Sequence, residues 1–195
     1  MKIPLFPLKT VLFPGGLLPL RVFETRYVDM TRDCLKNHQP FGVCLIHAGK
    51  EIGEPAVPEA VGCLAEIVDC DMEQLGVLQV RVRGGQRFRI REKEADSHGL
   101  LHATVNLLEP EPQVALQPEF KACAQLLQIM AADASKSAFE EPYYFEDSSW
   151  VGYRLTEVLP IPLTAKQKML ELDEPVLRLE ILQRFLEQRG LIRRG

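Results

Sequence analysis

The residues with the clearest potential for chemistry lie between positions 77 and 92, where the chain reads VLQVRVRGGQRFRIRE. Arginines alternate there with apolar residues. Because successive side chains of a strand point to opposite faces, this spacing predicts a β-hairpin with one basic face and one apolar face. A guanidinium-rich face could bind phosphates or an acidic peptide. The arginines concerned are Arg81, Arg83, Arg87, Arg89 and Arg91.

A second interpretation of the arginine face is a solvated sheet surface balanced by nearby carboxylates such as Glu66 and Asp69. We favour it, because no aromatic residues interleave with the arginines and base stacking would lack a platform. One face of such a hairpin can be apolar only if Val82 lies opposite Phe88. This pairing predicts a three-residue loop over 84–86 or a bulge there.

Acidic residues could form a metal site or a general acid/base pair just before this segment. They are Glu66, Asp69, Asp71 and Glu73. The stretch over 71–76 is more typical of a polar turn between strands. The histidines and cysteines show no paired spacing for zinc, so we expect no metal and no cofactor.

The serines offer no recognisable nucleophile. None of them sits in a G-x-S-x-G elbow, and the chain contains neither a Walker A phosphate loop nor G-x-G-x-x-G. We therefore expect no catalytic residues and a protein that is not an enzyme.

Aromatic residues gather in the second half of the chain and could mark a surface that binds polypeptide. The alternative, which we favour, is packing within the helical part. The candidates are Tyr143, Tyr144, Phe145, Trp150 and Tyr153.

Polar residues also follow an apolar run near the start, in LFPGGLLPLRVFETRY over 12–27. Pro14 and Gly15 predict a turn between two apolar strands. Phe23 and Tyr27 then fall on the core face of a helix with Met30 and Cys34. We expect at least one contact of Glu24, in the first helical turn, with Arg21 or Arg26.

The elements that would position these residues change in character along the chain. Strands are expected at 3–8, 17–22, 41–48, 61–70 and 100–108, with one helix after residue 22. Beyond the proline-rich stretch 109–112 the pattern becomes helical, with caps at Ser148 or Ser149, at Thr164 with Gln167 in a capping box, and at Asp173. We therefore expect the α+β class, with a β-rich part at 1–112 and a helical bundle at 113–195.

Composition sets further limits. The chain has 195 residues and a net charge of −4, so nucleic-acid binding would need a local basic face. Five scattered cysteines without C-x-x-C favour reduced thiols, and no apolar run approaches the length of a membrane span. These features predict a cytoplasmic protein that does not associate with membranes.

The landmarks IPLFPL, LFPGG, LPLRVFETRY, FGVCLI and GGQRFRI together resemble the N-terminal substrate-binding domain of the Lon protease family. The P-L-F-P-L and F-E-x-R-Y elements together are its specific part, and the structural signature comprises Pro14, Gly15, Phe23, Glu24, Arg26 and Tyr27. Val22 and Thr25 depart from the usual isoleucine and proline.

The resemblance implies a β-rich, PUA-like pseudo-barrel lobe followed by a helical bundle. It also implies the binding of substrate proteins. In full Lon proteases an ATPase module and a protease module follow this domain, but the present sequence shows no phosphate loop, so we expect a stand-alone copy without these modules. We therefore expect a non-catalytic module that binds unfolded polypeptide or a partner protein and is linked to proteolysis or quality control. RNA binding through the arginine face is the alternative.

Overall fold

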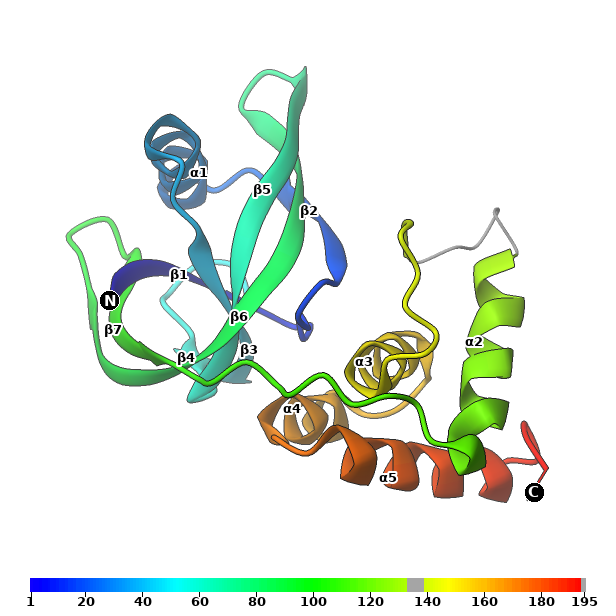
Figure 1. Cartoon of the computed structure of the whole chain (residues 1–195). Coiled ribbons are helices and arrows are strands. Elements are labelled where there is room, and N and C mark those ends of the chain that lie inside the picture. The colour runs from blue at the N-terminus through cyan, green and yellow to red at the C-terminus, as the bar shows by residue number, and fades with distance from the viewer. Residues whose placement is uncertain (133–138, 194–195) are drawn as a thin grey trace. The chain divides into compact units, whose positions relative to one another are not determined.

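The computed structural model describes residues 1–132 and 139–193, apart from the side chain of Glu73, and it separates into two compact units. The first runs from Met1 to Pro110 and the second from Glu111 to Gly195. The first is built mainly of strands and the second of helices, so the α+β class expected from the sequence is confirmed (Figure 1).

The first unit is a ring of strands. Its elements are β1 (Lys2–Leu8), β2 (Leu17–Val22), α1 (Thr25–Asn37), β3 (Phe41–Ala48), β4 (Val57–Pro58), β5 (Val61–Gln74), β6 (Val77–Ala95) and β7 (Leu101–Leu107). Hydrogen-bonded neighbours follow the order β1-β7-β6-β5-β3, and β1 also pairs in parallel with β3, which closes the ring. β2 pairs with β6 outside this path.

The sheet buries apolar side chains on both of its faces. One cluster includes Phe6, Phe41 and Val43 and also takes in Tyr27 and Met30 of α1. The other is centred on Leu5 and Phe88. Neighbouring residues of one strand, such as Leu5 and Phe6, are thus buried in different apolar clusters. Because both faces of these strands are buried, β1 and β3 are nearly continuous apolar runs.

The expected hairpin over 77–92 is wrong, because β6 continues through both glycines as one strand of 19 residues. The turn lies earlier, at Leu75 and Gly76, where Gln74 pairs with Val77. Gly84 is needed for a close approach instead. Its N–H donates to Gly16 O at 2.8 Å, and a side chain there would collide with the carbonyl oxygen of Phe13.

A bulge does occur in β6 at this position. Ala65 lies opposite Gly84 and Cys63 opposite Arg87, so β6 carries one extra residue between these two pairs. One inserted residue moves the following side chains to the other face. Val82 therefore belongs to the first core, whereas Phe88, also at an even position, belongs to the second.

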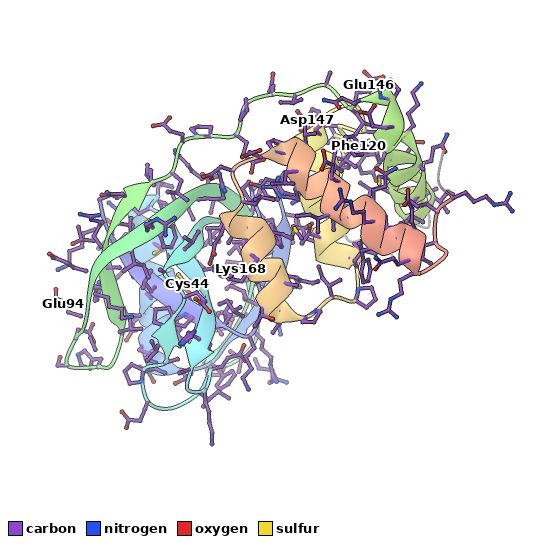
Figure 2. The ribbon with its side chains drawn as sticks, turned by 90° about the horizontal axis from the view of Figure 1, so that it is seen from below. Cys44, Glu94, Phe120, Glu146, Asp147 and Lys168 are labelled. Carbon is purple, nitrogen blue, oxygen red and sulfur yellow. The ribbon has the colours of Figure 1, made fainter. Side chains whose placement is uncertain are left out.

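The described residues of the second unit form five helical segments. They are η1 (Pro118–Phe120), α2 (Lys121–Ala132), α3 (Ser148–Val158), α4 (Leu163–Glu171) and α5 (Pro175–Gln188). Buried residues of α2, α3 and α5, among them Leu127, Leu155 and Leu182, form one apolar core. Figure 2 labels Phe120 in η1, which belongs to the same core, and Asp147 directly before α3.

The predicted helix starts need correction. Asp147, and not Ser148 or Ser149, caps α3, and its carboxylate accepts from Trp150 N at 2.7 Å. α4 begins at Leu163 after Pro162, so Thr164 does not cap it. Glu174 rather than Asp173 precedes α5. In each case the chain enters the helix one or two residues away from the side chain that the capping pattern favoured.

Candidate functional site

Trp150, in the first turn of α3, is the centre of an aromatic cluster. We use this name for Phe139, Tyr143, Tyr144, Phe145 and Trp150. The ring of Phe145 stands edge-on to Trp150 with centroids 5.2 Å apart, and that of Tyr144 does so at 6.2 Å. Tyr143 and Phe139 lie 6.1 Å from the same indole. Edge-to-face contacts of this kind hold the rings in a defined arrangement.

The aromatic cluster joins the helical core to the surface. Phe139 is buried in the core, and Tyr143, Phe145 and Trp150 are half-buried against it. Tyr144 differs, because 54% of its surface is exposed. Most of these rings therefore pack, as we favoured from the sequence, and Tyr144 remains accessible on their outer side.

Tyr153 takes no part in this surface, although the sequence grouped it with the other aromatics. It is buried, and its hydroxyl donates to the carboxylate of Glu111. Ser149 Oγ donates to the same carboxylate at 2.6 Å. One helical turn separates these two residues of α3, so both reach the same acceptor.

Arg178 of α5 completes this buried polar group. Its two terminal nitrogens donate to Glu111 at 2.5 and 3.0 Å, and its guanidinium lies over the Tyr153 ring at 4.0 Å. Nε donates to Met169 O at 3.0 Å, and Nη2 donates to Leu172 O at 2.5 Å. One ion pair thus brings together four parts of the unit: the segment before η1, helix α3, helix α5 and the connection after α4.

Electrostatics at Glu111 follow from these contacts. Burial works to raise the pKa of its carboxyl, but hydrogen bonds and charge from Arg178, with help from Ser149 and Tyr153, lower the pKa below its ordinary value. The carboxylate is therefore held ionised. Its two oxygens accept from Arg178, Ser149 and Tyr153, which is typical of a structural ion pair.

Glu157 at the end of α3 is a second carboxyl in a largely buried ion pair, with 19% of its side chain exposed. Arg154 Nε lies 2.6 Å from its Oε2, and Lys166 Nζ of α4 donates to its main-chain oxygen at 2.6 Å. Burial raises the pKa of this carboxyl to about 7, although Arg154 and Lys166 act in the opposite direction. Sequence reasoning missed both ion pairs. The local signals were an arginine among the buried leucines of α5 and the i, i+3 spacing of Arg154 and Glu157.

The five arginines do not share one face, contrary to the sequence prediction, because the bulge in β6 separates them. Arg81 and Arg83 precede it and lie directly opposite Asp69 and Glu66 of β5. Acidic and basic residues at opposite positions of neighbouring strands attract each other, as the solvated-face interpretation expected.

The remaining three arginines follow the bulge. Arg87 is buried and lies opposite Cys63, whereas Arg89 and Arg91 are exposed. The continuous basic surface on which the RNA-binding alternative depended is therefore divided.

The acidic residues of β5 lie on a strand rather than in a turn, since β5 continues to Gln74. Within the described residues, no group of three or more His, Cys, Asp or Glu side chains is placed to hold a metal ion. In the same part of the chain, no helix combines the length and apolar character needed to cross a bilayer.

The strand–helix junction confirms one sequence prediction and corrects another. Arg26 Nη2 donates to Glu24 Oε2 at 2.9 Å, which is the expected Arg–Glu contact, and its Nη1 donates to Gly99 O at 3.0 Å. Tyr27 is buried and stacks on Phe6. Phe23, however, precedes the helix and is 48% exposed, because α1 starts only at Thr25.

The helical unit also contains an open cavity of about 690 Å³ between the start of α2 and the second half of α5. Acidic and basic side chains line it together, among them Glu119, Lys121, Glu180 and Arg184. This mixture favours no single class of ligand.

Comparison with known proteins places this geometry in a family. The model of the ATP-dependent protease La (LON) substrate-binding domain matches residues 2–188. A crystal structure of a Lon N-terminal domain protein from Xanthomonas campestris shares 38% identity, with a TM-score of 0.78 over 94% of this chain and 97% of that chain. The N-terminal domain of Lon protease from the Mycobacterium avium complex shares the fold, with a TM-score of 0.64, 19% identity, and coverage of 93% of this chain and 96% of that one.

Curated relatives point the same way. Lon protease of Cytophaga hutchinsonii is 25% identical over 95% of this chain and 24% of its own length. Protein cereblon of Danio rerio is 32% identical over 60% of this chain and 28% of its own length. The chain thus spans about a quarter of these relatives, and none of these matches supports RNA binding. The chain belongs to the family of the LON substrate-binding domain.

Proposed function

We propose that this protein is a non-catalytic module that binds unfolded or extended polypeptide and presents it for proteolysis or quality control. Membership of a substrate-binding family supports the class of partner. The observation that supports a particular binding surface is the exposed ring of Tyr144, which stands edge-on against Trp150. We therefore propose that polypeptide binds at the aromatic cluster.

The aromatic cluster suits this role for a physical reason. A large ring that neighbouring rings already hold in place loses little conformational entropy when it binds, and it offers apolar area to any unfolded segment. Trp150 stands edge-on to Tyr144, Phe145 in turn packs edge-on against Trp150, and Asp147 accepts from the main-chain N–H of Trp150. The same contacts explain how the surface accepts apolar segments of differing sequence, since burial of apolar area is non-directional.

The experiment is a titration of a fluorescently labelled acidic protein that has been unfolded by reduction and alkylation, followed by anisotropy. Tyr144→Ala should weaken binding by about tenfold, equal to about 1.4 kcal/mol, because the ring is the accessible part of the cluster. Ile129→Ala, which removes another exposed apolar side chain of the helical unit, is the control and should leave affinity unchanged. Equal affinity of the wild type and Tyr144→Ala would remove the aromatic cluster from the proposal.

A further inference from the structure

The β5–β6 hairpin carries apolar side chains that no other part of its unit covers. Figure 1 shows this hairpin extending away from the rest of the first unit. Leu75 at its turn is 98% exposed, Met72 54% and Val68 42%. Burial of such side chains against a partner would remove apolar area from water, and a methionine adapts readily to differently shaped partners.

The outer edge of β5 is also open in the described part of the chain. β3 pairs with β5 only from Cys63 to Ala65, and beyond Ala65 the strand pairs with β6 alone. A strand edge of this kind can take an additional extended segment. The edge is irregular, with register shifts between Ile67 and Asp69 and between Asp71 and Gln74.

These irregularities restrict the occupant. Bulges disfavour a long, regular ladder such as two identical edges would form. They do not prevent side-chain contacts with a short segment. A second copy is disfavoured for another reason as well, because residues 66–76 contain four acidic residues and no basic ones, and two such edges would repel each other.

The charge of the distal hairpin indicates which kind of partner it can bind. Arg81 and Arg83 lie directly opposite Asp69 and Glu66, but Asp71 lies opposite Gln79, which separates it from Arg21 of β2. Asp71 therefore has no directly opposite basic residue, and negative charge remains toward the tip. Nucleic acid and anionic lipid surfaces would be repelled there. A segment with lysine or arginine next to apolar residues complements both the carboxylates and the exposed Met72 and Leu75.

We propose that the distal β5–β6 hairpin docks a short, extended polypeptide segment that carries both basic and apolar side chains. The hairpin is a separate surface from the aromatic cluster, and it favours partners of opposite charge to the acidic chain used to test that cluster. Loss of either surface can therefore be recognised without loss of the other.

The test uses a labelled synthetic peptide of alternating lysine and valine, with anisotropy as the readout and a glutamate–valine peptide for comparison. The wild-type protein should bind the lysine peptide in a salt-sensitive way, since exposed charges are screened by salt. The double variant Met72→Ser/Leu75→Ser should bind it at least about tenfold more weakly. Both side chains are exposed, so the variant should fold as the wild type does, which circular dichroism checks.

Control variants distinguish binding at the hairpin from a general effect of removing exposed apolar side chains. Ile52→Ser removes an apolar side chain that is 60% exposed elsewhere in the first unit and should not change affinity, and neither should Tyr144→Ala. Asp71→Asn keeps an oxygen that can accept from Met72 N but removes the charge, so it should weaken binding and reduce the salt dependence.

Three results would overturn the proposal. They are absence of binding to the wild type, equal binding of the glutamate peptide, and an unchanged affinity of the double variant. A wild-type dimer in sedimentation that the double variant abolishes would assign the hairpin to a second copy and would equally overturn it.

Discussion

Glu111 and Arg178 are joined by two hydrogen bonds across 67 residues of sequence, and both side chains are almost completely buried. This ion pair connects the start of the helical unit to α5. Because α3 and the end of α4 contact the same two residues, the arrangement of the helices depends on it.

Arg178→Met should therefore destabilise the protein strongly. Removing one partner of a buried ion pair leaves the other charge without compensation and costs about 3–5 kcal/mol. Denaturant unfolding, followed by the fluorescence of the single tryptophan Trp150 in the same unit, measures the effect. Lys168→Met, which breaks the exposed pair with Glu171, is the control and should cost less than about 1 kcal/mol. Similar stability of Arg178→Met and Lys168→Met would contradict this account.

Gly84→Ala should destabilise the first unit by about 1–3 kcal/mol or more, because the new methyl group collides with main-chain atoms that cannot move independently. Thermal unfolding provides the measurement. Gly85→Ala is a close control, since its Cβ would meet Leu64 Cβ at an ordinary 3.5 Å. If both substitutions cost the same, the close approach of the chain at Phe13 is not the reason for a glycine at position 84.

Glu157 should make stability depend on pH near neutrality. Its pKa is raised from 4.5 to about 7 in the folded protein, so within this range the folded state keeps a proton that the unfolded state releases. The contribution of Glu157 to stability therefore falls as pH rises from about 4.5 to about 7 and stays constant above that range.

Glu157→Gln should remove this decline, which unfolding curves recorded at several pH values can show. Asp29→Asn, at an exposed residue of α1, is the control and should keep the wild-type slope. A wild-type stability that rises through the same pH range, with no change of slope in Glu157→Gln, would show that the carboxyl is ionised throughout.

Glu111 should act in the opposite direction at lower pH. Its pKa is lowered in the folded state, so the stability that it contributes is present above the ordinary pKa of a glutamate and is lost as pH falls below it. Glu111→Gln should weaken this acid dependence in the same unfolding curves, together with a general loss of stability. An unchanged acid limb would indicate that Arg178 does not hold the carboxylate ionised.

The sequence was sufficient to predict features that depend on residues close together in the chain. β2 and β3 were placed correctly, since each is an apolar run that ends at turn residues or at a helix. The contact of Glu24 with Arg26 was also predictable, because its partners lie only two positions apart in the sequence.

Predictions failed where distant segments decide the outcome. Glycines at 84 and 85 suggested a turn, yet the approach of Phe13 explains Gly84, and no local pattern shows that contact. The meeting of Glu111 with Arg178 depends on the packing of helices far apart in sequence. Phe23 fitted the helical period, but the helix begins only after it.

The most direct test of polypeptide binding is the emission of Trp150, the single tryptophan of the chain, during titration with an unfolded acidic polypeptide that lacks tryptophan. We expect a saturable change in emission, and Tyr144→Ala should shift the midpoint to higher concentration by about tenfold. An emission that stays constant while the labelled polypeptide binds would place the binding surface elsewhere and contradict the central claim.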